Sequence, residues 1–474
     1  MPPLKRPEKA TIVMLAPRRA LMAAQTDILV VGGGPAGLGA ALGAARAGAE
    51  VILCEQYGFL GGNATAALVN PFVSYYTQHH RRETPGAITF FPTDHGPGDP
   101  VISGVLADLI TRLVRVGGII PPSPETAYTV PFDPEAFKAV ADDMIDEAGV
   151  QLLLHCFASD VFREGDCIRG VVFETKSGPV VITARLIIDC TGDGDIAALA
   201  GAPFEVGREE DGLVQPMTLY FRMAEFRKAA FGAYVKKHPD QWLGVHGLWD
   251  LIRKAEKEEG FDLPREDILF FGTPHEKELS FNCSRVVKVL GTDVWDLTCA
   301  EMESRRQNRK IAAFMKKYVP GFEESYMVQS GATVGVRESR RILCDYRITS
   351  EDILGAAKFD DVIARGTYPV DLHNPEGKGT VLVYLPPGES YDIPLRSLLP
   401  KDFDSLLVAG RCISGSHEAH SSYRVMPICM ATGQAAGACA ALAARSSRSV
   451  REVPAREVQE ELIRQGANLG RNRF

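Results

Sequence analysis

Residues 26–37 read T-D-I-L-V-V-G-G-G-P-A-G, and this stretch decides the fold class. The apolar run over 26–31 is rich in β-branched residues, which is typical of a buried parallel strand. It leads directly into a G-x-G-x-x-G pattern formed by Gly32, Gly34 and Gly37. In this pattern the first glycine permits a tight turn, the second lets the backbone approach a pyrophosphate, and the third allows close helix packing.

The residues after the turn complete a strand–turn–helix–strand unit. Leu38–Ala47 is dominated by Ala and Leu and predicts a helix, which Gly48 ends before a second apolar strand at Glu50–Leu53. The helix N-terminus offers free N–H groups to phosphates. Glu55, 18 residues after Gly37, can accept hydrogen bonds from ribose hydroxyls. The spacing therefore predicts a dinucleotide site.

Later stretches favour FAD over NAD as the dinucleotide. A second glycine pair at 61–62 follows the ribose carboxylate and suits a loop that lies along a longer cofactor. Residues 187–195 and 405–411 are again apolar strands that end in small, polar turns. A helix is expected to open at 426–427, where Pro427 suits the first helical turn.

Stretches spread from residue 26 to about 445 resemble the FAD-dependent oxidoreductases of the glutathione-reductase-like flavoprotein fold. The resemblance extends more distantly to fumarate reductase and succinate dehydrogenase flavoproteins. It rests on D-I-L-V-V-G-G-G-P-A-G, F-L-G-G-N-A-T, F-D-P-E-A-F-K, I-D-C-T-G-D-G-D-I-A, G-V-R-E-S-R-R-I, and A-G-R-C-I-S-G-S-H followed by M-A-T-G-Q-A-A-G. It implies an α/β fold, with a Rossmann-like FAD-binding domain of the three-layer ββα type and an inserted α+β substrate-binding domain.

The predicted domain organisation is discontinuous. We expect an N-terminal extension, an FAD-binding domain in four pieces, a lid or loop region, a substrate-binding domain in two pieces and a C-terminal tail. Their ranges are 1–25 for the extension, 26–70, 126–215, 330–350 and 396–445 for the FAD-binding domain, 71–125 for the lid, 216–329 and 351–395 for the substrate-binding domain, and 446–474 for the tail.

The resemblance also implies which residues bind FAD. They would contact the pyrophosphate, the adenosine, the middle of the cofactor, its ribityl chain and, at the start of the last helix, the flavin edge. These residues are Gly32, Gly34, Pro35, Ala36, Gly37, Glu55, Gln56, Gly61, Gly62, Asn63, Thr65, Ala158, Thr191, Gly192, Asp193, Gly410, Arg411, Val425 and Met426.

Two motifs of related flavoproteins are missing. No second strand–G-x-G-x-x-G–helix unit follows residue 70, so we expect no separate NAD(P)H-binding domain. The ten cysteines include no C-x-x-C pair, which separates the chain from the disulfide reductases. The substrate should therefore meet the flavin directly.

The candidate catalytic residues gather in the stretch 414–424, S-G-S-H-E-A-H-S-S-Y-R. In the family's fold the corresponding loop passes over the flavin. We expect His417 or His420 to be the acid–base group, Tyr423 a hydrogen-bond donor and Arg424 a contact for an anion or for flavin. A loop histidine bonded to the backbone is the equal alternative. The H-x-x-H pattern has no third ligand nearby, so we predict no metal site.

A second candidate stretch is 335–341, G-V-R-E-S-R-R. If it is helical, Arg337 and Arg341 share a face and Arg340 lies beside them. Guanidinium groups can bind a carboxylate or phosphate in bidentate fashion. We assign Arg337 to the substrate and expect the other two to form structural ion pairs.

Composition excludes several classes of function. The 474 residues carry a formal charge of -8, which gives no basic field for nucleic acid. We expect charges to interrupt every apolar run before about 18 residues, and hence no membrane span. Pro17-Arg18-Arg19 breaks the apolar region that a secretory signal needs, and scattered cysteines suit reduced thiols, so we predict a cytoplasmic protein.

These observations predict an FAD-dependent oxidoreductase that transfers hydride between a small organic substrate and flavin N5, as an oxidase or dehydrogenase. The electron acceptor would be oxygen or a redox partner, and a homodimer is the candidate assembly. Two alternatives stay open: an ene-reductase of the fumarate-reductase type and a flavoprotein subunit that passes electrons to a partner. A monooxygenase or halogenase is disfavoured because no nicotinamide domain is evident.

Overall fold

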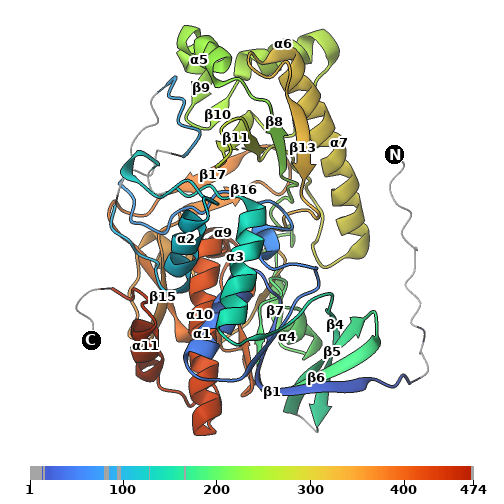
Figure 1. Ribbon diagram of the computed structural model, residues 1–474, viewed down its shortest axis with the longest axis vertical. Coiled ribbons are helices and arrows are strands. Elements are labelled where there is room, and N and C mark those ends of the chain that lie inside the picture. The colour runs from blue at the N-terminus through green and yellow to red at the C-terminus, as the bar shows by residue number, and fades with distance from the viewer. Residues whose placement is uncertain are drawn as a thin grey trace.

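The structure, a computed structural model, describes residues 13, 17–79, 85–92, 98–126, 129–164 and 167–470 (Figure 1). His80 and His95, within the predicted lid region 71–125, lie outside these residues, as does most of the segment 1–25.

The lower part of the molecule in Figure 1 is built on a seven-stranded sheet. Its order is β3-β2-β1-β6-β5-β4, and β19 pairs with β6. Strands β1, β2, β3, β6 and β19 run parallel, whereas β4 and β5 add an antiparallel hairpin. The strand bounds are β1 Leu21–Val31, β2 Val51–Cys54, β3 Gln151–Leu153, β4 Phe157–Glu164, β5 Cys167–Thr175, β6 Gly178–Asp189 and β19 Leu406–Val408.

The register brings the carboxyl ends of the parallel strands to one edge of this sheet. Val31 lies opposite Cys54 on β2 and opposite Asp189 on β6, and Val408 of β19 also lies opposite Asp189. The loops that follow four strands distant in sequence therefore start side by side. Ligands of such sheets bind at this edge.

Strand β1 is longer than the predicted strand. It starts at Leu21 rather than at Thr26, because residues from 21 onward pair with β6 beginning at Val180. The last residues of the predicted extension are thus part of the central sheet.

Two glycine- and alanine-rich helices, α1 (Pro35–Arg46) and α10 (Met426–Ser446), pack against each other below this edge. The predicted helix positions agree with α1 and α10 to within a few residues. By length and composition α10 could cross a membrane, which corrects the expectation that charges interrupt every long apolar run. In the structure, however, 94% of its apolar window is buried inside the protein, as in the core helix of a soluble domain.

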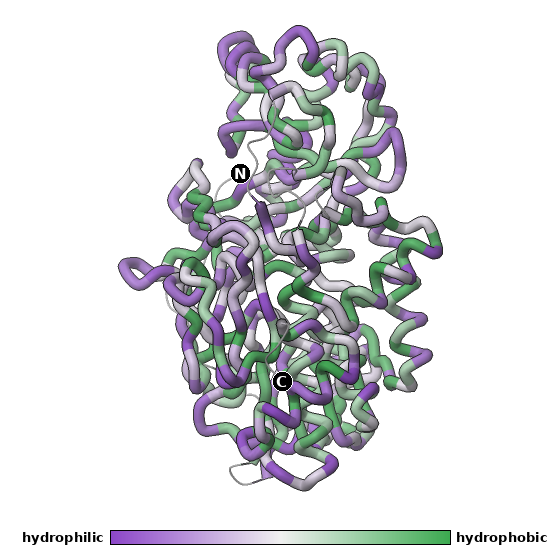
Figure 2. Tube along the Cα trace, turned by 90° about the vertical axis from the view of Figure 1, so that its left-hand side faces the viewer, coloured by the Kyte–Doolittle hydropathy of each residue, from purple (hydrophilic) through white to green (hydrophobic). Residues whose placement is uncertain are grey.

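The upper part of Figure 1 contains a second, six-stranded antiparallel sheet of order β13-β8-β12-β11-β10-β9. Its core is rich in aromatic residues, including Phe231, Trp242 and Phe270. In Figure 2 hydrophilic residues lie mainly on the outer turns of this part and hydrophobic residues inside it. The elements are β8 Phe221–Ala224, α5 Lys228–Lys237, β9 Trp242–Leu243, β10 His246–Gly247, α6 Trp249–Glu259, β11 Ile268–Gly272, β12 Leu279–Phe281, α7 Val294–Tyr318 and β13 Tyr326–Ser330.

The other elements join the two parts and cover the lower one. Strands β15 and β18, from the segment 351–395, bury their side chains in the core of the central sheet rather than in the aromatic core. Helix α11, in the predicted tail, does the same through Val458 and Leu462. The bounds are α2 Val105–Arg115, α3 Pro134–Glu147, α4 Asp195–Leu199, β7 Phe204–Val206, β14 Arg340–Ile342, α8 Ser350–Leu354, β15 Val362–Gly366, β16 Val370–His373, β17 Thr380–Val383, β18 Tyr391–Pro394, α9 His417–Tyr423 and α11 Ala455–Arg464.

The structure thus confirms the predicted α/β class. A mostly parallel sheet has the strand–glycine turn–helix unit at its centre, as in a Rossmann-like fold.

Candidate active site

A cavity of about 510 Å³, here called the glycine-lined cavity, lies at the carboxyl edge of the parallel strands. It collects residues from the loops after β1, β2, β6 and β19. The predicted FAD-binding residues that line it are Gly32, Gly34, Pro35, Ala36, Glu55, Gln56, Gly62, Asn63, Ala158, Thr191, Gly192, Asp193, Arg411 and Met426.

The backbone geometry at Gly32 and Gly37 requires glycine, as the motif predicts. Gly32 has a φ of +98°, and a Cβ there would lie 2.5 Å from the carbonyl oxygen of Cys190. A Cβ on Gly37 would lie 1.7 Å from the carbonyl oxygen of Gly32, so only glycine lets α1 start this close to the turn. Gly34 precedes α1, and no side chain caps that helix start, so its first N–H groups are open to phosphate oxygens.

Glu55 lies buried at the end of β2 and faces the turn. Its carboxylate accepts hydrogen bonds from the backbone N–H groups of Gly33, at 2.5 Å, and Tyr57, at 2.9 Å. Burial raises the pKa of Glu55, although these backbone hydrogen bonds oppose the shift. The carboxylate thus fixes the turn and also lines the cavity.

The loop after β6 is held by a buried aspartate and an arginine. Asp189 accepts hydrogen bonds from the backbone N–H and hydroxyl of Thr191, at 3.0 and 2.7 Å. Arg411 donates to the carbonyl of Gly192 at 2.8 Å, to the carboxylate of Asp193 at 2.6 Å and to the carbonyl of Val336 at 2.7 Å. One guanidinium therefore joins three segments around the cavity.

The other predicted FAD residues lie elsewhere. Gly37, Gly61, Thr65 and Gly410 do not line the glycine-lined cavity but support its wall; the Thr65 hydroxyl, for example, donates to the carbonyl of Leu60 at 2.7 Å. Val425 lines the neighbouring cavity instead. Sequence reasoning missed several lining residues, because they carry no motif of their own: Cys54, Tyr57, Cys156, Cys190, Gly291, Thr292, Thr333, Val334, Val336, Arg340, Ala409 and Cys429.

This cavity fits FAD on its own features. Its floor is formed by glycine backbone, an uncapped helix start faces it, and a carboxylate lies at the end of the second strand. A pyrophosphate and a ribose need donors and acceptors of these kinds. Among the described residues, no group of three or more His, Cys, Asp or Glu side chains is arranged to hold a metal ion.

A second cavity of about 670 Å³, here called the large cavity, adjoins the first. Both cavities are lined by Asn63, Val336, Arg411, Arg424 and Met426, so the two cavities are direct neighbours. The large cavity lies between the central sheet and the second sheet. Loop residues of the predicted lid, among them Pro71, Val73 and Pro92, contribute to its wall.

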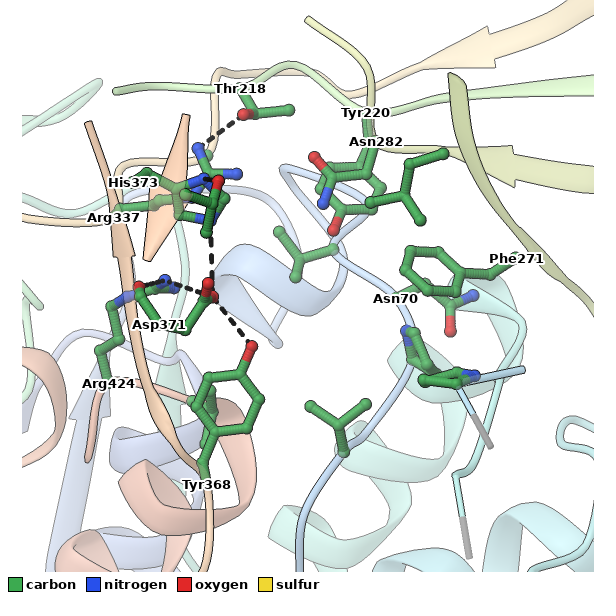
Figure 3. A pocket seen from close by; sticks show the side chains of 18 of the residues that line it. Asn70, Thr218, Tyr220, Phe271, Asn282, Arg337, Tyr368, Asp371, His373 and Arg424 are labelled. Carbon is green, nitrogen blue, oxygen red and sulfur yellow. Dashed lines mark hydrogen bonds and ion pairs between the residues drawn. The ribbon is translucent and has the colours of Figure 1, made fainter. Parts of the chain in front are cut away.

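One wall of the large cavity is charged (Figure 3). Tyr368 donates a hydrogen bond to Oδ2 of Asp371 at 2.9 Å, and Arg424 reaches the same oxygen at 3.3 Å. Burial by itself would raise the pKa of Asp371, but His373, Arg424 and Tyr368 hold it well below its usual range. Asp371 is therefore an anion at neutral pH.

Arg337 lies on the same wall. One of its terminal nitrogens donates to the carbonyl of Pro216 and to the hydroxyl of Thr218, both at 2.6 Å. Burial and the positive charge of Arg424 lower the pKa of Arg337 to about 9. Burial is the largest cause of this shift and the charge of Arg424 adds to it, so an anion bound beside Arg337 would oppose the shift.

The opposite wall is mainly apolar. Tyr220, Val245 and Phe271 belong to one small hydrophobic cluster and line the cavity, with Leu269 beside them. Burial raises the pKa of Tyr220 to about 12, so its phenol stays protonated. Figure 3 shows Tyr220 and Phe271 across the cavity from Asp371.

The predicted acid–base residues are not at either cavity. His417, His420 and Tyr423 on α9 are buried and line neither cavity. His417 lies 2.8 Å from the buried carboxylate of Glu338, and the Tyr423 hydroxyl donates to the carbonyl of Ile413 at 3.0 Å. The loop is helical here, so these side chains turn into the protein. Only Arg424, just after the helix, reaches the cavities.

The arginines of 337–341 are separated in the same way. Their segment is not helical: 340–342 forms strand β14. Arg341 is buried in an ion pair with Glu338, and Arg340 pairs with Asp195 at 2.8 Å. Arg337 alone of the three lines the large cavity, while Arg340 lines the glycine-lined cavity.

Comparisons with known proteins agree with this architecture. A family model described as FAD dependent oxidoreductase matches residues 27–462. No curated protein matches the chain significantly.

Similar solved structures include a geranylgeranyl bacteriochlorophyll reductase-like protein from Thermoplasma acidophilum (14% identity, 94% of this chain, 85% of that chain, TM-score 0.45). A flavin-dependent brominase (10% identity, 93% and 84%, TM-score 0.46) is another. A third is a p-nitrophenol 4-monooxygenase from Pseudomonas putida (11% identity, 93% and 84%, TM-score 0.42). Because the family model spans nearly the whole chain, the protein belongs to the FAD-dependent oxidoreductase family.

Proposed function

We propose that this flavoenzyme is an oxidase or dehydrogenase that takes hydride from a small organic anion bound in the large cavity. The observation that carries the proposal is that the two neighbouring cavities share five lining residues, Asn63, Val336, Arg411, Arg424 and Met426. A substrate in the large cavity would meet the flavin end of FAD with no protein relay between them. Bound FAD supplies the hydride acceptor.

The residues that line the glycine-lined cavity would hold FAD. Glu55 would bind the adenosine ribose, and the start of α1 the pyrophosphate. Met426, the first residue of α10, lines both cavities, so the positive end of that helix would face the flavin edge that becomes negative on reduction.

Arg337 would orient the substrate through an anionic group. Its two other nitrogens, Nε and the second terminal nitrogen, have no hydrogen-bond acceptor among the described residues. A guanidinium edge of this kind matches a carboxylate. Asp371, an anion that lines the cavity, would accept a hydrogen bond from the substrate and so orient it, whereas His417 and His420 line neither cavity. Because the pKa of Asp371 is held well below its usual range, the proton that leaves the substrate with the hydride would pass on to solvent rather than stay on this carboxylate.

The proposal is tested by mixing the holoenzyme with small organic anions in the absence of oxygen and following loss of the oxidised flavin absorbance. For a compound that reduces the flavin, we expect Arg337→Ala to weaken substrate binding by about 10- to 100-fold, because a hydrogen bond to a charged group contributes about 1.5–3 kcal/mol. Arg337→Lys should recover part of this loss, since lysine keeps the positive charge but lacks the planar guanidinium edge that donates two parallel hydrogen bonds.

Arg253→Ala is the matched control, because Arg253 lies exposed on α6 away from both cavities. Oxygen uptake during turnover would identify an oxidase, and its absence with dye reduction a dehydrogenase. If organic anions fail to reduce the flavin but unsaturated carboxylates reoxidise the reduced enzyme, the direction is that of an ene-reductase and the proposal is wrong.

A further inference from the structure

The charged wall of the large cavity offers two unused hydrogen-bonding groups of opposite kind. Arg337 presents the donor edge described above. Asp371 presents Oδ1, which accepts no hydrogen bond from the described residues, while Tyr368 and Arg424 both approach Oδ2. Asp371 and Arg337 line the same cavity and project from the same side of it (Figure 3).

His373 fixes the carboxylate without competing for the ligand. The guanidinium of Arg285 lies 3.1 Å from Nδ1 of His373 and can only donate, so Nδ1 is an acceptor and the proton is on Nε2. Nε2 lies 3.4 Å from Oδ2 of Asp371. Burial and Arg337 lower the pKa of His373 to about 3, which agrees with a neutral ring. Among the described residues, the side chains that contact this carboxylate therefore reach Oδ2 and leave Oδ1 to the cavity.

The charge at this wall selects the ligand. Arg337 and Arg424 carry two positive charges against one on Asp371, and His373 is neutral. The other acidic groups of the cavity already have partners: Asp267 lies 2.6 Å from His246 and 3.5 Å from Arg265, and Glu266 lies 4.0 Å from Arg285. A ligand with one negative charge would balance the remaining positive charge, whereas a zwitterion would not.

We propose that the large cavity recognises a 2-hydroxy carboxylate with an apolar substituent, its carboxylate bound by Arg337, its hydroxyl donating to Oδ1 of Asp371 and its substituent packed against Tyr220 and Phe271. This inference rests on the proposed function and names its substrate class. Asp371 acts here as a specificity-determining residue, because its ionised carboxylate accepts a hydrogen bond from the ligand hydroxyl, and a deoxy analogue has no hydroxyl to donate one.

The test measures binding without turnover. Atrolactate (2-hydroxy-2-phenylpropanoate) has the carboxylate, the hydroxyl and an aromatic ring but no hydrogen on C2 to lose as hydride. 2-Phenylpropanoate lacks the hydroxyl, 2-phenyl-2-propanol lacks the carboxylate, and 2-amino-2-phenylpropanoate replaces the hydroxyl with an ammonium. A pair of smaller compounds, 2-hydroxyisobutyrate and isobutyrate, tests the same preference for the hydroxyl in case the aromatic ring is too large for the cavity. Each compound is titrated into the oxidised holoenzyme, and the dissociation constant is read from the flavin absorbance change and from calorimetry.

We expect atrolactate to bind at least about tenfold more tightly than its analogues without the hydroxyl, without the carboxylate or with an amino group. 2-Hydroxyisobutyrate should likewise bind at least about tenfold more tightly than isobutyrate. A tenfold difference in the dissociation constant is what one good hydrogen bond to a charged group contributes. Asp371→Asn should abolish the preference for the hydroxyl while carboxylate binding persists. Arg337→Gln should weaken every carboxylate and leave the alcohol unchanged. The second variant keeps the test decisive if Asp371→Asn disturbs folding by leaving Arg424 unpaired.

Equal binding of the hydroxy and deoxy acids, or tighter binding of the amino acid, would overturn the inference. Failure of the proposed function looks different: the hydroxy acids would bind as described, yet oxidisable members of the class would leave the flavin oxidised under anaerobic conditions.

Discussion

Neighbouring arginines in 337–341 show how little a residue type says about its role. Arg341 lies in a buried ion pair with Glu338 and donates to the carbonyls of Gly207 and Gly415. Such a group fixes the segments around it, because removing one partner would leave a buried charge unpaired. Arg337, four positions earlier, keeps one edge of its guanidinium for the large cavity. The difference arises from what surrounds each side chain.

Glu55 carries a prediction at the same scale. We expect Glu55→Ala to weaken FAD binding by about tenfold or more, because the carboxylate both faces the cofactor and holds the N–H groups of Gly33 and Tyr57. FAD retention after gel filtration and the dissociation constant for FAD measure the effect. Glu50→Ala is the control, since Glu50 is exposed just before β2. Retention of FAD equal to the wild type would contradict the ribose assignment.

At the scale of elements, the contact between α1 and α10 depends on glycines in both helices. A Cβ on Gly433 would lie 2.0 Å from the carbonyl oxygen of Ala36, and one on Gly39 would lie 2.2 Å from that of Met430. The atoms approached belong to backbone, which cannot move as a side chain can. This close packing sets the distance between the two helix starts that face the cofactor.

We therefore expect Gly437→Ala to destabilise the protein by about 1–3 kcal/mol, as overpacking does. Its added methyl would lie 2.1 Å from the carbonyl oxygen of Ala40. The melting temperature of the holoenzyme measures the loss. Gly377→Ala is the control, because a Cβ there meets no atom within 4 Å. A melting temperature at or above that of the wild type would show that the helices can separate at no cost.

The short helix α9 explains why the predicted acid–base histidines lie away from both cavities. The stretch 414–424 is polar enough to predict an exposed active-site loop. Ser416 instead caps a helix by accepting the N–H of Ala419 at 3.1 Å, and seven helical residues turn both histidines inward. A polar composition predicts hydrogen bonding but not its direction, so the histidines bond within the protein or lie buried.

At the scale of the whole molecule, the FAD site is assembled from segments that lie far apart in the sequence. Loops after β1, β2, β6 and β19 meet at one edge because the parallel register aligns their ends. Arg411 joins the loop after β6 to the segment at Val336. A cofactor that contacts all these segments should hold them together.

Removal of FAD should therefore lower the melting temperature, and added FAD should restore it. Ligand at 100 times its dissociation constant contributes about 2.7 kcal/mol to the stability of the form that binds it. Scanning calorimetry of the flavin-free and reconstituted protein, over a range of FAD concentrations, measures the shift. AMP is a matched ligand, because it reaches only the adenosine part and should restore less. A melting temperature independent of FAD would exclude a cofactor bound across these loops.

The sequence by itself determined the α/β class, the cofactor and the position of its central turn. These follow from local rules: a short apolar strand, glycines where a Cβ would clash with backbone, and an acid at the end of the next strand all act within about thirty residues. The same rules located Arg337 and Arg424 as candidates from charge and motif.

Only the tertiary structure decided which candidates reach the cavities. Asp371, His373 and Tyr368 lie in and beside β16, a segment without a motif, and they meet Arg424 and Arg337 from other parts of the chain. The apolar wall comes from the second sheet. Contacts between distant segments depend on register, on helix direction and on which side chains are buried, and no short stretch of sequence contains that information.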